Sequence, residues 1–131
     1  MFEVITPLNP KFEEYKLELK VLYEENQEKI ADTNSFEFVI ENSFFYAFLN
    51  KNSLIGAIYY FVDEDKLFLN AYSKRKNHLN NILCLEWSTT WFSCDIYAEA
   101  QNRASAICLL KCGFSRVENN LFCKKKDYLL V

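Results

Sequence analysis

The sequence predicts one α/β domain, spanning residues 1–131, that is built on a mixed β-sheet with helices on both faces. Its 131 residues are half hydrophobic, so the chain buries a core without needing a disulfide or a metal. Segments with strand-like and helix-like spacing of apolar residues follow one another in the order β-α-(α)-β-β-β-α-β-α-β-β. Three consecutive strands followed by a strand-helix-strand crossover indicate a mixed sheet.

The first part of the chain predicts a strand over Phe2–Thr6 and then a long helix. Asn9 followed by Pro10 marks the helix start, because proline suits the first helical position. Apolar residues recur at helical spacing as far as Ile30. A shorter helix is expected over Ser35–Glu41, with its serine as the cap.

The middle of the chain predicts three strands, over Phe44–Leu49, Leu54–Val62 and Lys66–Tyr72. The segments between them, 50–52 and 63–65, are rich in Asn and Asp and are read as turns.

The last part alternates helices and strands. A helix is expected from Leu79 to Trp91, and the short helix that comes later ends before Gly113. Asn119-Asn120 are typical of a tight hairpin turn, because asparagine tolerates a positive φ. The remaining expected elements are the strand Asp95–Ala100, the helix Ala104–Lys111 and the hairpin strands Phe114–Glu118 and Leu121–Lys125.

Charge and cysteine content argue against several classes of protein. The net charge of −3 is spread along the chain, which does not favour a nucleic-acid partner. No apolar run is long enough for a membrane span and the N-terminus is too polar for a signal peptide, so a cytoplasmic protein is expected. With one histidine, no metal site is expected. Buried, reduced thiols are expected at Cys84, Cys94, Cys108, Cys112 and Cys123.

The segment from Asn102 to Phe114 carries the most specific pattern in the chain. Asn102 stands where it can cap a helix, Lys111 lies in that helix's last turn, and Gly113 offers a left-handed exit. The segment reads Asn102-Arg103-Ala104-Ser105-Ala106-Ile107-Cys108-Leu109-Leu110-Lys111-Cys112-Gly113-Phe114.

This segment resembles the late motif of the GNAT N-acetyltransferase superfamily, N-x-x-(S/A)-x-x-x-(L/Y)-x-K-x-G-F. Ile55-Gly56 also resembles the family's common Val-Gly pair on the second strand of the meander. Because the element order fits as well, the resemblance covers nearly the whole chain. It implies the GNAT fold and a site for acetyl-CoA.

The resemblance implies that strand backbone and a phosphate-binding loop would hold acetyl-CoA. The loop would correspond to Ser73–Asn80, with Arg75 in the place of the family's opening Arg or Gln. The implied cofactor-binding residues are Ala71, Tyr72, Ser73, Arg75, Lys76, His78, Asn80, Asn102 and Ser105.

The phosphate-binding loop departs from the family pattern at two positions. His78 and Asn80 stand where the family has glycine or alanine, and a Cβ there obstructs close approach of the main chain to a phosphate. Losing two such charge-assisted contacts costs at least roughly 3 kcal/mol, about a hundredfold in affinity. Leu109 also replaces the tyrosine that commonly re-protonates the CoA thiolate in the family.

No general base stands out from the sequence. Tyr60 and Glu99 are the catalytic candidates, with Tyr97 beside them, because they lie on strands expected to border the acceptor cleft.

Three functions remain open at this point. The first is a non-catalytic structural or interaction protein with a degenerate acetyl-CoA site. Its setting could be a virion, because short, glycine-poor chains with a Lys-Arg-Lys run resemble virion-associated proteins of short-tailed bacteriophages. It would contact a protein partner or a second copy through exposed aromatic residues or the apolar tail Asp127–Val131. The alternatives are an acetyl-CoA-dependent N-acetyltransferase and a pseudoenzyme that binds CoA without transfer.

Overall fold

Seven strands and four helices make up the part of the chain that the computed structural model describes, residues 2–74 and 78–126. The strands form one sheet in the order β1-β2-β3-β4-β5-β7-β6. The elements are β1 (Glu3–Ile5), α1 (Phe12–Ile30), α2 (Phe36–Glu41), β2 (Phe44–Asn50), β3 (Ser53–Asp63), β4 (Lys66–Ser73), α3 (His78–Thr89), β5 (Ile96–Glu99), α4 (Arg103–Lys111), β6 (Ser115–Glu118) and β7 (Leu121–Lys124).

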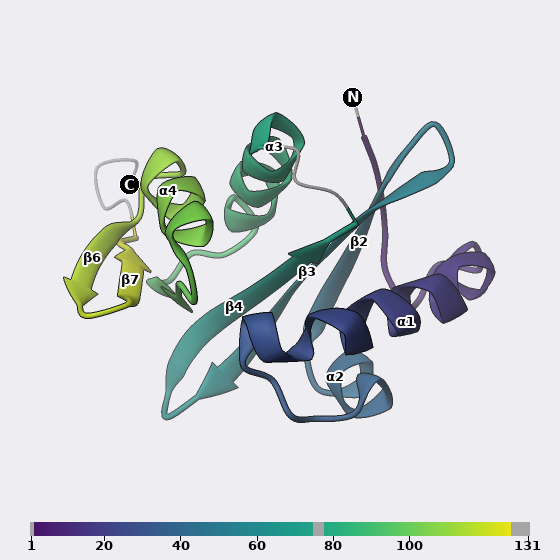
Figure 1. Ribbon diagram of the computed structural model, residues 1–131, viewed down its shortest axis with the longest axis horizontal. Helices are drawn as coiled ribbons and strands as arrows, with labels where there is room; N and C mark the ends of the chain where they lie inside the picture. Colours follow the sequence, from purple (N-terminus) through teal and green to yellow (C-terminus); the bar gives the residue numbers. More distant parts are fainter. Residues whose placement is uncertain (1, 75–77, 127–131) are drawn as a thin grey trace.

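The sheet is mixed, as the sequence predicts. β4 and β5 run parallel, and every other neighbouring pair in the sheet is antiparallel. Helices α1 and α2 cover one face and α3 and α4 cover the other, as Figure 1 shows. The predicted order of elements is therefore confirmed.

Two hydrophobic cores lie on opposite faces of the sheet. Alternate residues of each central strand enter different cores, because successive side chains of a strand point to opposite faces. On β3, Tyr59 packs in the core under α1 and α2, whereas its neighbour Tyr60 packs in the core under α3 and α4. Each core is therefore built from one face of the same strands.

The first helix begins two residues later than the sequence predicts. The backbone N–H of Phe12 donates to the carbonyl oxygen of Asn9 at 2.9 Å, which closes a turn tighter than an α-helical one. Asn9 still accepts from the N–H of Lys11 through its side chain, at 2.9 Å. The cap predicted at Ser35 is confirmed, since its hydroxyl accepts from the N–H of Phe38 at 3.1 Å.

Left-handed backbone conformation marks the turns between the strands. Lys51 and Asn52, and likewise Glu64 and Asp65, adopt positive φ in the two hairpins that join β2, β3 and β4. Asn119 does the same between β6 and β7, with φ of 42°.

The five cysteines are thiols, but their burial is not uniform. Cys84, Cys112 and Cys123 are buried, Cys108 is partly buried and Cys94 is exposed, so the expectation of burial fails at Cys94. None of the described helices is long and apolar enough to cross a membrane. Residues 2–74 and 78–126 also contain no group of three or more potential metal ligands.

Candidate functional site

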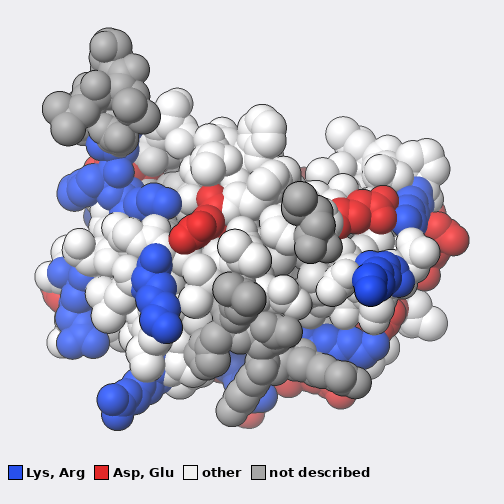
Figure 2. Space-filling view, turned by 90° about the horizontal axis from the view of Figure 1, so that it is seen from above, with Lys and Arg blue, Asp and Glu red and all other residues white. Residues whose placement is uncertain are grey.

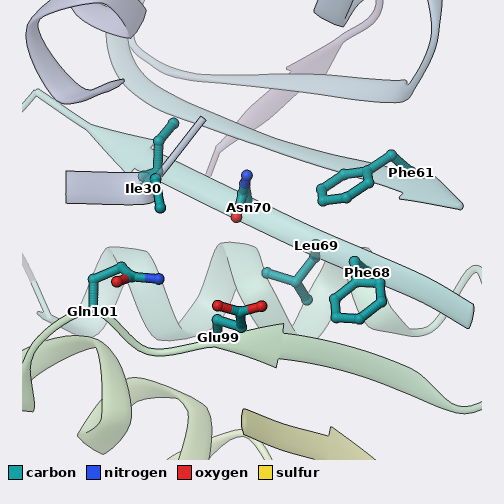
Figure 3. A pocket seen from close by; sticks show the side chains of 8 residues that line it. Ile30, Phe61, Phe68, Leu69, Asn70, Glu99 and Gln101 are labelled. Carbon is teal, nitrogen blue, oxygen red and sulfur yellow. The ribbon is translucent and has the colours of Figure 1, made fainter. Parts of the chain in front are cut away.

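Strands β4 and β5 part from each other halfway along β4. They pair at Leu67, Phe68 and Leu69 of β4. Beyond these, Asn70, Ala71 and Tyr72 have β3 as their sheet partner in the described part of the chain. A pocket of about 80 Å³ opens where the strands diverge (Figure 3). This slot pocket is lined by Ile30, Ala31, Phe61, Phe68, Leu69, Asn70, Glu99 and Gln101.

Polar groups from both strands meet in the slot pocket. Asn70 of β4 turns its amide oxygen into the space in front of β5, and the Glu99 carboxylate of β5 points back toward β4 (Figure 3). Gln101, just beyond β5, directs its amide into the same space. The slot pocket thus presents two acceptors, the Asn70 oxygen and the Glu99 carboxylate, and one donor, the Gln101 amide nitrogen, beside the aromatic walls of Phe61 and Phe68.

A buried hydrogen-bond network lies behind Asn70. Its amide nitrogen donates to the Tyr59 hydroxyl at 3.1 Å, and that hydroxyl donates to Asp32 at 2.7 Å. Asp32 also accepts from the backbone and side-chain nitrogens of Asn34, both at 2.9 Å. Burial, followed by the hydrogen bond to Asp32, raises the pKa of Tyr59, so its hydroxyl stays protonated.

The two catalytic candidates lie on different faces of the sheet. Glu99 lines the slot pocket and is exposed to it. Tyr60 is fully buried in the opposite core, where its hydroxyl lies 2.6 Å from the Ser88 hydroxyl, and it does not line the pocket. Burial raises the pKa of Tyr60. Tyr97 shares the pocket face of the sheet and packs against Phe68.

The β4 residues predicted to hold a cofactor lie beside the slot. Ala71 is exposed, whereas the Tyr72 side chain is buried under α1 and its hydroxyl donates to the Leu19 carbonyl at 3.2 Å. Ser73 ends β4 opposite Gly56. A Cβ on Gly56 would press against the Tyr72 carbonyl oxygen and lie 2.7 Å from the Ser73 Cα, so close packing of β3 on β4 requires glycine here.

The segment from Asn102 to Phe114 forms α4 and its two ends. Asn102 caps the helix, because its side-chain oxygen accepts from the Ser105 N–H at 2.9 Å. Gly113 leaves the helix with φ of +90°. Leu109 is buried in the core and therefore contributes no polar group to the slot. The local structural roles predicted for this motif are confirmed.

The predicted phosphate-binding loop leads into the first turn of α3. His78 and Asn80 lie in that turn. Arg75 and Lys76 fall outside the described residues. Lys74 pairs with Glu18 of α1 at 2.7 Å. On the left of Figure 2, over α4, β6 and β7, Lys and Arg side chains gather.

Sequence reasoning missed Asn70, Tyr59 and Asp32. The available signal was Asn70 itself, a polar residue inside the apolar run Leu67–Tyr72. The sequence alone does not show the role of Asn70, because its hydrogen-bond partners come from β3 and from the segment that follows α1.

A second surface feature lies along α3. A shallow groove of about 440 Å³ is lined by Phe2, Leu83, Glu86, Trp87 and Thr90. Next to it, the ring of Trp91 contacts that of Trp87 at 5.5 Å between centroids and is 63% exposed. These six residues form the aromatic groove. Most of the chain's other aromatic side chains pack inside the two cores.

Comparison with solved structures identifies the fold. No family model and no curated protein matches the sequence. Aminoglycoside 6′-acetyltransferase type Ii aligns over 95% of this chain and 96% of its own, with a TM-score of 0.66 and 16% identity. A GNAT-family acetyltransferase from Streptococcus pneumoniae aligns over 97% and 100%, with a TM-score of 0.62 and 14% identity.

A third structure was solved with a ligand. PaiA N-acetyltransferase from Thermoplasma acidophilum, in complex with coenzyme A, aligns over 98% of this chain and 99% of its own, with a TM-score of 0.54 and 18% identity. The chain has the GNAT acetyltransferase fold, and the fold expected from its motif is confirmed.

Proposed function

We propose that the chain is an N-acyltransferase that takes acetyl-CoA between β4 and β5 and acetylates a primary amine held in the slot pocket. The observation that carries this proposal is the parting of the two strands after Leu69 and Ala98. An extended ligand can lie along strand backbone that no neighbouring strand covers. The PaiA structure, which has the same fold, was solved in complex with coenzyme A.

The slot pocket offers one group for acyl transfer, the Glu99 carboxylate. The amine nitrogen would form a bond to the thioester carbonyl carbon, and the carbon–sulfur bond would break. Glu99 would accept a proton from the attacking amine, since it is a carboxylate facing the pocket. The departing thiolate would take its proton from water, because Leu109 offers none. The hydroxide that remains would be neutralised by the proton that Glu99 releases. Positioning supplies the remaining rate enhancement.

Acetyl-CoA binding is expected to be weak. His78 and Asn80 are the residue types at the start of α3, where the GNAT pattern has glycine or alanine. The N-terminal N–H groups of a helix still favour a phosphate, whatever the side chains are. We therefore expect the site to bind acetyl-CoA with a dissociation constant roughly a hundredfold above that of a glycine-containing loop.

The binding step is tested by thermal unfolding with increasing acetyl-CoA, up to several millimolar. A concentration about a hundred times the dissociation constant stabilises the folded protein by about 2.7 kcal/mol. An unchanged unfolding temperature across the titration contradicts the proposal.

The transfer step is tested with acetyl-CoA and n-butylamine. The product is followed by mass spectrometry, because the exposed thiol of Cys94 would consume a thiol-detecting reagent. Glu99→Gln should lower turnover by about a hundredfold or more and keep the acetyl-CoA stabilisation. Glu118→Gln, which changes an exposed glutamate on β6, is the matched control and should leave turnover unchanged. Equal turnover in Glu99→Gln and Glu118→Gln would exclude Glu99 as the base.

The aromatic groove supports a second candidate, a non-catalytic interaction protein whose acetyl-CoA site is degenerate. Trp91 is 63% exposed beside Trp87 and Leu83, and exposed aromatic and aliphatic surface of this kind is typical of protein contacts. The partner could be a second copy or a component of an assembly such as a phage particle. This candidate predicts no response to acetyl-CoA. It also predicts a complex in sedimentation with the candidate partner that Trp91→Ser weakens.

A further inference from the structure

The orientation of one amide decides which chemical group the slot pocket can hold. Asn70 can present either its carbonyl oxygen, an acceptor, or its NH₂ group, a donor. In the structure the oxygen faces the pocket and the nitrogen faces away from it (Figure 3). The opposite orientation would place two donors in the same space and reverse the preference of the pocket.

The partners behind Asn70 fix this orientation. Asp32 is a carboxylate and only accepts, so the Tyr59 hydroxyl must give its proton to Asp32, at 2.7 Å. The Tyr59 oxygen is then an acceptor for Asn70, whose nitrogen lies 3.1 Å away. Turning the amide over would set its carbonyl oxygen against a hydroxyl oxygen that has no proton left to offer. The hydrogen bonds that join Asp32, Tyr59 and Asn70 therefore permit only one orientation of the Asn70 amide.

The network is held rigidly. Tyr59 is 1% exposed and lies between the rings of Phe45 and Phe61, at 5.9 and 6.1 Å between centroids. Asp32 is held by both nitrogens of Asn34 and follows the left-handed residue Ala31, which ends α1. Neither Asp32 nor Tyr59 lines the slot pocket. Both act on the pocket through Asn70.

We propose that Asp32 and Tyr59 are positioning residues that hold the Asn70 carbonyl oxygen in the slot pocket. There, together with the Glu99 carboxylate, that oxygen selects an amino group over a hydroxyl group of the same size. An amine brings two or three N–H donors to these two acceptors, whereas an alcohol brings one. The aromatic walls of Phe61 and Phe68 also favour an ammonium group. This inference rests on the proposed function in one respect, namely that the selected amine is the acceptor of the acetyl group.

The network is tested without catalysis, by the side-chain NH₂ signals of Asn70 in the ¹⁵N–¹H spectrum, assigned by their loss in Asn70→Asp. Tyr59→Phe removes the acceptor, so these signals should move and their hydrogen exchange should speed up at least tenfold. Tyr60→Phe is the matched control, because it removes a buried hydroxyl from the next residue, on the opposite face. Unchanged Asn70 signals in Tyr59→Phe would overturn the inference.

Selectivity is tested by titrating the folded protein with n-butylammonium chloride and, separately, with n-butanol. The wild type should bind the ammonium more tightly, with the Asn70 and Gln101 signals moving. In Tyr59→Phe the ratio of the affinities for butylammonium and butanol should fall about tenfold, which corresponds to the loss of one hydrogen bond. In Tyr60→Phe this ratio should stay as in the wild type. Equal affinities for the two probes in the wild type would contradict the inference.

The two proposals fail differently. If the wild type binds butylammonium selectively but never acetylates it, the proposed function fails and the amine-selective pocket stands. If the wild type acetylates n-butylamine, Tyr59→Phe should raise the KM for the amine about tenfold and leave the KM for acetyl-CoA unchanged. A Tyr59→Phe enzyme with wild-type KM values for both substrates would leave the proposed function standing and remove the inference.

Discussion

Asn102 illustrates how a single side chain can serve both the fold and a ligand. Its side-chain oxygen accepts from the Ser105 N–H at 2.9 Å and caps α4. The same residue is one of those that the resemblance to the GNAT pattern implies for binding acetyl-CoA. The cap uses the oxygen, which leaves the amide nitrogen for a ligand at the exposed end of the helix.

The two roles of Asn102 separate by substitution. Asn102→Ala should lower the free energy of unfolding by about 1 kcal/mol, because a helix cap is lost. Asn102→Asp keeps the accepting oxygen and should restore most of that stability, but it removes the NH₂ group and should weaken the stabilisation by acetyl-CoA. Urea unfolding and acetyl-CoA titration measure the two effects. An Asp variant that still responds fully to acetyl-CoA would limit Asn102 to its role as a cap.

The limits of sequence reasoning at this scale appear at Tyr59 and Tyr60. Both lie in the same apolar strand segment, and only strand pairing shows that Tyr59 faces α1 and Tyr60 faces α3. Strand alternation requires neighbours to face opposite ways, but it does not say which core each one enters. The sequence therefore favours Tyr60 as a candidate and gives no signal for Tyr59, which contacts Asn70.

At the scale of elements, the position of β4, which forms one side of the slot pocket, depends on its close packing against β3. Their register is unbroken from Gly56 and Ser73 to Asp63 and Lys66. Gly56 is the point of closest approach, and its missing side chain leaves room for the Tyr72 carbonyl. The positions of Tyr72 and Ser73, which lie beyond the last β4–β5 pair, therefore depend on Gly56 of β3.

Gly56→Ala should therefore destabilise the protein by about 1–3 kcal/mol, because the new methyl group overlaps backbone atoms that cannot rotate away. It should also displace Tyr72 and Ser73 and reduce any stabilisation by acetyl-CoA. Ile55→Val, a loss of one methyl group at the adjacent position, should cost less and preserve the ligand response. Thermal unfolding with and without acetyl-CoA gives both quantities. A Gly56→Ala protein as stable as the wild type would show that β3 can move away from β4 without cost.

Element types and their order were predictable because each has a local signal. Ser35 caps α2 and Gly113 ends α4, and both effects depend on a few neighbouring residues. The sequence predicts the start of α1 at Pro10, but the helix begins at Phe12, because the tight turn closed by Phe12 and Asn9 also fits proline. The slot itself was not predictable. Where two strands stop pairing depends on long-range packing that no local pattern encodes.

At the scale of the whole molecule, two cores on opposite faces of one sheet enclose many ionisable side chains in their neutral forms. Burial raises the pKa of the Cys84 thiol to about 12 and that of Cys112 to about 11, from an ordinary value of 9.0. Burial likewise raises the pKa of Tyr59, Tyr60 and Tyr72. Both cores therefore depend on these groups staying protonated.

The fold should consequently be most stable below pH 9 and lose stability as the pH rises toward 12. Above pH 9 the unfolded chain releases thiol protons that the folded chain retains, so the unfolded state is favoured by about 1.4 kcal/mol per pH unit for each buried thiol. Urea unfolding between pH 8 and pH 10.5 measures this slope. Cys84→Ala should reduce it by one thiol's share, and Cys94→Ala, at the exposed cysteine, should leave it unchanged. Equal slopes in these two variants would mean that the folded protein tolerates the charged Cys84 thiolate. That result would contradict the claim that this core keeps its thiols neutral.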